Sequence, residues 1–324
     1  MRKIITIAET VLDTIYREGQ PVRSFVGGRI PCAAASLAQM GLPTFMVSEC
    51  TTDCVGDLVM DYLRRHQVDV TSVDRYPDGS TSFSAIFEQT DGTSKIVNYG
   101  SYPADRFKVI WPRIDQDDIV IFGSLYAVDL PQRERLYELV SYAVERKAII
   151  IYLPGFQHGI NFRITRVMPN VLENLEAASI VITHERDLES IFPGESAEDA
   201  FRNHIEFYCN SHFHITPELS LKRFASHKCQ EVKTELSIVD NKLGWQAGLT
   251  AGIVYTLLVK GVTYDTLSSL DDAQWEEVMN EALKWAQAST GAENCVDADW
   301  VAQHRDALKE GLDTYEQARV QSLR

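Results

Sequence analysis

The sequence predicts a three-layer α/β/α protein in which a central, mostly parallel sheet lies between helices and a small β-sheet covers one edge. Short β-branched and apolar runs alternate with helical stretches over most of the chain, as in right-handed βαβ units. Two tracts, 14–26 and 80–104, instead carry the period-two alternation of β-ribbons. We therefore expect one domain, 1–324, with these two tracts forming a lid inserted in the α/β core.

The first half of the chain predicts both ribbons. A nearly continuous apolar run at 3–8 suits a buried strand. The tract 14–26 is a hairpin around Gly19 and Pro21, and 80–99 alternates on both sides of Asp91 and Gly92, which is a strong hairpin signal. Between the ribbons we expect an alanine-rich helix at 31–40, a strand at 44–50 and an amphipathic helix at 55–68.

From residue 118 onward the pattern is strand and helix in alternation. The tract 244–260 is rich in small residues and then apolar, which predicts a helix buried against the sheet. Strands are expected at 118–124, 148–154 and 178–184, and further helices at 133–147 and 275–290.

Composition narrows the possible partners. The 324 residues include 31 Lys and Arg against 46 Asp and Glu, a net charge of −15, which disfavours nucleic acid and anionic membranes. The six cysteines form no C-x-x-C pair, so we expect reduced thiols and no metal site. The apolar start contains Glu9 and Asp13 and is a first strand rather than a signal peptide, and no run of about 18 apolar residues occurs. We expect a cytoplasmic protein.

Several ordered motifs carry a family resemblance. The segment GGRIPCAAASLAQMG, 27–41, matches G-G-x-x-x-N-x-A-x-x-L-x-x-L-G with Cys32 in place of the asparagine. An opening G-E-x-x-x-D has its counterpart in Glu9 and Asp13, and a D-x-x-G step in Asp53 and Gly56. With the FGS at 122–124 and the order of elements, the chain resembles the ribokinase-like (PfkB-type) carbohydrate kinases over almost its whole length.

The resemblance implies a sugar under the lid and MgATP at the carboxyl edge of the sheet. It assigns Asp13 to sugar hydroxyls. The substrate-binding residues that we expect are Asp13, Gly27, Gly28, Cys32 and Tyr99. Because family members often pair their lids, it also implies a homodimer, which would cover the exposed ribbon edges.

The catalytic motif is eroded. The family's G-A-G-D turn supplies anion-binding N–H groups and the Asp that takes the hydroxyl proton. Here it reads Gly244, Trp245, Gln246 and Ala247, and an alanine methyl cannot accept a proton. Asp240 is an alternative base that would have to act through a water.

The nucleotide motifs are altered as well. The N-x-x-E segment reads from His184 to Asp187, and the T-x-G-x-x-G turn reads from Thr216 to Leu221 with Glu218 in place of the first glycine. The D-P-N-x-R segment has become LPGFQ at 153–157. A carboxylate in the nucleotide turn would repel phosphates, so the ATP side is less well kept than the sugar side.

Structural roles remain open for the same residues. Asp13 also suits a lid salt bridge, the two glycines a hinge, Cys32 a small buried apolar residue and Tyr99 lid packing. His184 also suits a surface or core position and Asp187 an ordinary helix position. Three functions follow as hypotheses: a non-catalytic homologue that binds a sugar, a sugar phosphate or a partner chain; an active sugar kinase with an atypical base; and a lid-mediated interaction protein.

Overall fold

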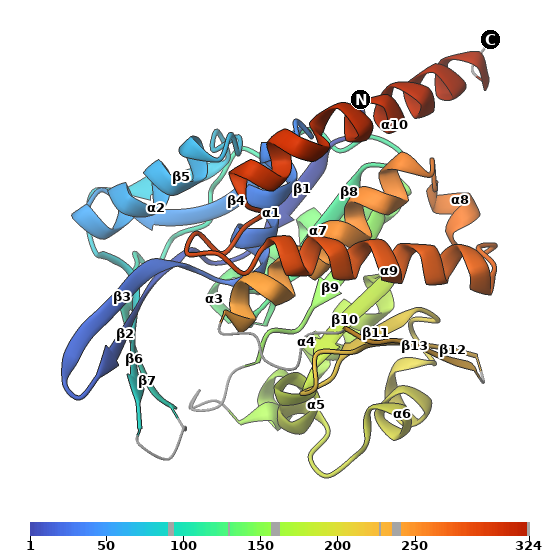
Figure 1. Ribbon diagram of the computed structural model, residues 1–324. Coiled ribbons are helices and arrows are strands. Elements are labelled where there is room, and N and C mark those ends of the chain that lie inside the picture. Colours follow the sequence, from blue (N-terminus) through green and yellow to red (C-terminus); the bar gives the residue numbers. More distant parts are fainter. Residues whose placement is uncertain (90–93, 129, 157–162, 227, 235–240, 323–324) are drawn as a thin grey trace.

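A computed structural model of the chain describes residues 1–89, 94–128, 130–156, 163–226, 228–234 and 241–322 (Figure 1). The described residues form a large sheet between two helical layers, with a smaller sheet projecting from one edge (Figure 1). The predicted fold class is thereby confirmed. The turn expected at Asp91 and Gly92 lies outside the described residues.

The large sheet has nine strands in the described chain, in the order β13-β12-β11-β10-β9-β8-β1-β4-β5. All pairs from β11 to β5 are parallel, and β12 and β13 extend the other edge antiparallel. The strands are β1 Ile4–Ile7, β4 Thr44–Thr51, β5 Val73–Tyr76, β8 Ile119–Gly123, β9 Ile149–Leu153, β10 Ile180–His184, β11 His212–Ile215, β12 Leu221–Ala225 and β13 Lys228–Val232.

Alternating strand residues feed two separate apolar cores. Ile4 packs into the core beneath α1, α2, α7 and α9, whereas the next residue, Ile5, packs into the core beneath α3, α4 and α5. Continuous apolar strands such as β1 are therefore buried on both faces, as a parallel sheet requires. The helices of the first layer are α1 Arg29–Gln39, α2 Cys54–Arg65, α7 Lys242–Val259, α9 Asp272–Ala288 and α10 Ala298–Ser322, with the short α8 Tyr264–Leu267 between α7 and α9. The second layer holds η1 Leu125–Ala127, α3 Leu130–Glu145, α4 Ile164–Ala177, α5 Glu185–Ile191, α6 Ala197–Ala200 and η2 Phe201–Ile205.

The smaller sheet joins the two ribbons in the order β3-β2-β6-β7. Strand β2 runs antiparallel to β3 and parallel to β6, and β6 runs antiparallel to β7. Its strands are β2 Val11–Arg17, β3 Gln20–Gly27, β6 Ser80–Glu88 and β7 Ser94–Ser101. Because β2 follows β1 after three residues, this sheet starts at the carboxyl edge of the large sheet.

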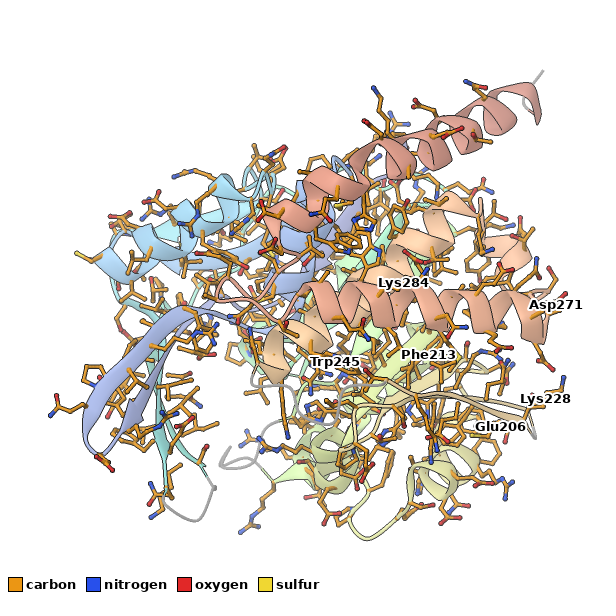
Figure 2. The ribbon with its side chains drawn as sticks, in the orientation of Figure 1. Glu206, Phe213, Lys228, Trp245, Asp271 and Lys284 are labelled. Carbon is orange, nitrogen blue, oxygen red and sulfur yellow. The ribbon has the colours of Figure 1, made fainter. Side chains whose placement is uncertain are left out.

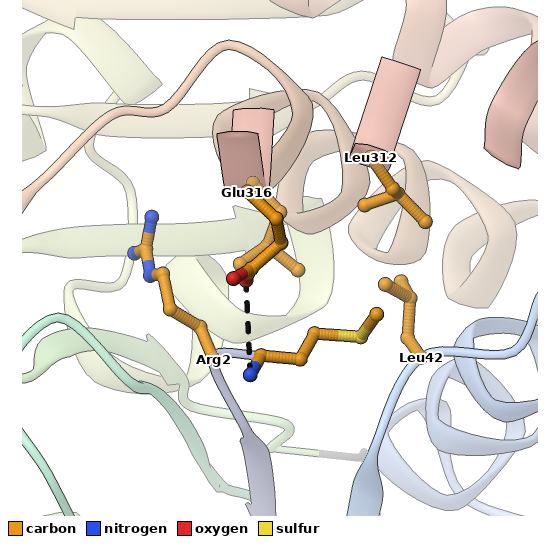
Figure 3. A pocket seen from close by; sticks show the side chains of 6 residues that line it. Arg2, Leu42, Leu312 and Glu316 are labelled. Atoms are coloured by element: carbon orange, nitrogen blue, oxygen red, sulfur yellow. Dashed lines mark ion pairs between the residues drawn. The ribbon is translucent and has the colours of Figure 1, made fainter. Parts of the chain in front are cut away.

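Helix α10 projects from the molecule near the amino ends of the parallel strands, away from the small sheet (Figure 1). The N-terminal ammonium lies 3.7 Å from Glu316, beside a small apolar pocket lined by Leu42, Leu258 and Leu312 (Figure 3). This pocket is at the amino ends of the parallel strands, away from the expected site. No helix in the described parts of the chain is long and apolar enough to cross a lipid bilayer.

Candidate functional site

Asp13 lies at the root of the small sheet and is held against Gly27. A β-carbon built on Gly27 would lie 2.0 Å from Asp13 Oδ2, so a side chain at position 27 would displace the carboxylate. Burial raises the pKa of Asp13 to about 6, and the neighbouring Ser84 side chain partly opposes this rise. The carboxylate is therefore a partly desolvated acceptor near the junction of the two sheets.

Two polar residues that the sequence analysis missed extend Asp13 into a row. Asp13 is paired with Ser84 of β6, and Ser84 with Asn98 of β7. Ser84 Oγ donates to Asn98 Oδ1 at 2.7 Å. Side chains directly opposite in a sheet share one face, so the three residues form a polar row across the lid. Their only sequence signal is period-two polarity within the ribbons, which does not identify the facing partner.

Tyr99 is not part of this row. It is paired with Phe83, one position away from the row on both strands, and neighbouring strand residues point to opposite faces. Its side chain is 60% exposed, with its ring centroid 6.3 Å from that of Phe83. The structure therefore separates Tyr99 from Asp13.

The glycine pair leads directly from the lid into helix α1. Gly28 is the N-cap of α1 with a φ of 90°, a conformation that glycine adopts without steric cost. Cys32 lies in the first turn and is fully buried, with its Sγ 3.5 Å from the carbonyl oxygen of Val26, and burial raises its thiol pKa. Cys32 is thus a core residue beneath the hinge.

Glu9 also lies at this edge of the large sheet. Its Oε2 accepts hydrogen bonds from the Ser124 hydroxyl and, at 3.2 Å, from the Tyr126 N–H. These contacts connect the end of β1 to the segment after β8. The retained Glu9 and FGS motifs therefore meet in the fold, close to where the lid begins.

The altered N-x-x-E segment caps helix α5 and binds an arginine. His184 Nδ1 accepts from the Asp187 N–H at 3.2 Å, while Asp187 Oδ2 accepts from the His184 N–H at 3.0 Å. The same Oδ2 accepts from Arg29 Nη2 at 3.0 Å, and both side chains of this ion pair are buried. Burial lowers the pKa of His184 to about 4, so its ring is neutral near pH 7.

Arg29 was also missed by the sequence analysis, although a signal was present. It is the first residue of α1, where the helix dipole opposes a positive charge. A buried cation at that position needs an acidic partner, but the sequence does not show which one. The partner is 158 residues away in the chain.

The residues of the expected anion-binding turn lie inside helix α7, which begins at Lys242. The N-cap Asn241 uses its side-chain oxygen to accept from the Gly244 N–H at 3.1 Å, and its backbone oxygen accepts from Trp245 N at 3.1 Å. Trp245 is fully buried in the core (Figure 2). Ala247 is also fully buried, and Gln246 is half-buried. Gly244 itself packs so closely on α9 that an added β-carbon would lie 2.0 Å from the Ser289 carbonyl oxygen.

The turn from Thr216 to Leu221 closes on itself between β11 and β12. Thr216 N donates to Ser220 O at 3.0 Å, and the two hydroxyls lie 2.9 Å apart. Leu219 is buried with a φ of 66°, a strained value for a leucine, while Glu218 is exposed. The Ser220 N–H of the turn donates to Thr216 Oγ1 at 3.2 Å, so this backbone donor is satisfied within the turn.

A divalent metal does not fit the residues described at this edge. In nucleotide sites Mg²⁺ is held by one or two carboxylates together with waters and substrate phosphates. Asp187 is already paired with Arg29, and no group of three or more His, Cys, Asp or Glu side chains suited to a metal occurs within the described ranges. Asp240 and Gln157, which the sequence analysis names among the altered motifs, lie outside those ranges.

Comparison with known proteins agrees with the architecture. A family model for the pfkB family of carbohydrate kinases matches residues 1–204. No curated protein sequence matches the chain.

Solved structures with the same fold cover nearly the whole chain. A fructokinase from Vibrio cholerae O395, bound to fructose, ADP and calcium, aligns with a TM-score of 0.75 at 16% identity over 94% of this chain and 98% of its own. Aminoimidazole riboside kinase from Salmonella enterica, with aminoimidazole riboside and an ATP analogue, gives 0.74 at 15% identity over 96% and 99%. A sugar kinase from Pyrococcus horikoshii gives 0.73 at 15% identity over 96% and 99%.

Proposed function

Because the chain belongs to the pfkB family of carbohydrate kinases, we propose that it binds a sugar or sugar phosphate beneath the small sheet but does not phosphorylate it. The proposal depends on Ala247, a buried methyl within a continuous helix, which the motif alignment of the sequence analysis places opposite the family's catalytic aspartate. Loss of a general base costs about 10²–10⁴ in rate. We therefore propose a pseudokinase that acts as a sensor or as the silent subunit of a kinase pair.

Besides the missing base, the start of α7 gives a second reason to propose that phosphoryl transfer is lost. An anion hole needs backbone N–H groups that are free to face the transferred group. Here the Gly244 N–H is bonded to the N-cap side chain and the Trp245 N–H to the N-cap backbone, so neither is available. The closed Thr216 turn and its exposed Glu218 argue in the same way against a nucleotide phosphate.

The sugar side supports ligand binding. Asp13, Ser84 and Asn98 offer a carboxylate, a hydroxyl and an amide on one face of the lid, which are the groups that bind sugar hydroxyls. The solved relatives bind fructose and aminoimidazole riboside. We propose a ligand of this furanose-like class.

Calorimetry with fructose, ribose, aminoimidazole riboside and their phosphates, followed by an ADP-release assay with MgATP, tests the proposal. We expect at least one of these ligands to bind to the native chain and the binding to be lost in Asp13→Asn, without ADP release. Turnover in the usual kinase range of about 1–100 s⁻¹ would contradict it and favour the active-kinase alternative with an atypical base. Failure of every ligand to bind would favour an interaction protein.

We also propose a cytoplasmic homodimer formed through the small sheet. Its edge strands β3 and β7 carry exposed apolar side chains, Val22 at 50%, Val97 at 41% and Tyr99 at 60%. Unpaired sheet edges with apolar side chains are usually covered. The six free cysteines suit a reducing compartment. Light scattering should give twice the chain mass for the native protein and one chain mass for Val97→Lys; a native monomer would contradict the dimer.

A further inference from the structure

The buried carboxylate of Asp187 already has a permanent counter-ion. Asp187 is fully buried, and its Oδ2 accepts from Arg29 Nη2 and from the His184 N–H, each at 3.0 Å. A carboxylate held away from water is stable only when a positive charge or several donors face it. Among the described residues, Arg29 is the group that supplies the charge.

The neighbouring His184 and His214 do not act as positively charged counter-ions of Asp187. His184 turns Nδ1 toward the Asp187 N–H as an acceptor, and burial lowers its pKa to about 4. His214 lies close to the same carboxylate, and burial also lowers its pKa to about 4. Both rings are neutral near pH 7, and Arg186 and Lys222, the other cations near these rings, form no ion pair with Asp187 within the described ranges.

The buried Arg29 guanidinium in turn needs Asp187 as its counter-ion. Its side chain is 8% exposed, it begins a helix whose dipole opposes its charge, and a guanidinium stays protonated in proteins. Arg29 Nη1 and Asp187 Oδ1 are buried and have no hydrogen-bond partner in the part of the chain that the structure describes. The two charges therefore compensate each other between the first turns of α1 and α5.

We infer that the Arg29 guanidinium is the fixed counter-ion of Asp187 and excludes a divalent cation from this carboxylate. The fixed positive charge repels a second cation, and the carboxylate oxygen that faces it is already committed to Arg29 and the His184 N–H. The inference deepens the proposed function, because ligand binding at this edge then needs no magnesium. We therefore expect the site to bind a free sugar or sugar phosphate rather than a complex of that ligand with a metal ion.

Manganese titration followed by electron paramagnetic resonance tests this inference directly, since Mn²⁺ loses its free-ion signal when bound. Three full-length proteins are compared: native, Arg29→Gln, and the double variant Arg29→Gln/Asp187→Asn. We expect Arg29→Gln to bind Mn²⁺ at least about tenfold more tightly than the native chain, because the Asp187 carboxylate then lacks its counter-ion and can hold a hydrated cation. The double variant should return to the native level.

The double variant is the matched control for the acidic surface, because it keeps the native net charge of −15. It also keeps the comparison valid if Arg29→Gln alone does not fold, since a neutral pair leaves no buried charge. Mn²⁺ binding by the native chain that disappears in the double variant would overturn the inference, as would a folded Arg29→Gln that gains no site. The titration uses neither sugar nor turnover, so its failure is separate from failure of the proposed function.

Discussion

Asp13 Oδ2 occupies the space that a side chain at Gly27 would need, with only 2.0 Å between the oxygen and an ideal β-carbon at that position. The carboxylate belongs to β2, and Gly27 ends β3 directly before helix α1. The junction between the small sheet and α1 and the acceptor proposed for the sugar are therefore one packing unit. A change at one of them must alter the position of the other.

Gly27→Ala should therefore weaken sugar binding without removing any polar group. The added methyl must push the Asp13 carboxylate out of its present position, because the two cannot share the space. We expect a loss of at least about tenfold in affinity by calorimetry, equivalent to about 1.4 kcal/mol. Gly291→Ala is the control, since nothing lies within 4 Å of its β-carbon position and its affinity should equal the native value. Equal affinities for all three proteins would contradict the displacement.

Asp13 should also make the protein less stable as the pH rises. Its pKa is raised from 3.8 to about 6 in the folded chain, so between these values the folded state binds the proton that the unfolded state has released. Its contribution to the free energy of unfolding is then largest below pH 4 and falls until about pH 6. The shift sets an upper limit of about 3 kcal/mol.

Urea unfolding of native protein and Asp13→Asn at pH 4 and pH 7 measures this contribution, because all other titrating groups are shared. Relative to the native chain, the variant should gain stability between pH 4 and pH 7. The same pH dependence in both proteins would show that Asp13 titrates as an exposed carboxyl group.

Restoring an aspartate at position 247 should not restore catalysis. Ala247 is fully buried in α7, and the new carboxylate would lack a counter-charge, which costs about 3–5 kcal/mol in comparable buried sites. We expect Ala247→Asp to release no ADP above background and to unfold at lower urea. Lys242→Asp is the control, because residue 242 is exposed in the first turn, where a negative charge is favourable. ADP release by Ala247→Asp would mean that a nucleotide site is already formed.

The fold could be predicted because its signals are local. The buried run at 4–7, the alternating ribbons and the Gly27–Gly28 pair each encode their own backbone path, and right-handed βαβ connections leave few ways to assemble them. The joining of both ribbons into one sheet is expected because the second ribbon lies between α/β units, and the pairing of β2 with β6 agrees with it. Hydrophobic pattern, local propensity and turn residues therefore all predict the same fold, as a well-specified sequence requires.

The candidate site was harder to predict because its contacts are distant in sequence. The Arg29–Asp187 pair and the Asp13–Ser84–Asn98 row depend on strand register and on which helices meet. The start of α7 depends on Asn241, which serves as N-cap while its side-chain amide also donates to Gly291 O at 2.6 Å. A motif comparison alone therefore assigned Gly244 to a turn, whereas the structure has it in the helix.

Gly244→Ala tests whether Gly244 is needed for close packing of α7 rather than for a turn. Alanine favours a helix over glycine by about 1 kcal/mol, but the added carbon would lie 2.0 Å from the Ser289 carbonyl oxygen, which cannot rotate away. Overpacking of this kind costs about 1–3 kcal/mol, so we expect lower stability in urea unfolding. Gly311→Ala is the matched helical control: its β-carbon would meet only the end of the Val259 side chain, at 2.9 Å, which can shift. Equal stability of the two variants would contradict a packing role, because only a glycine pressed against a rigid backbone should be intolerant of one methyl group.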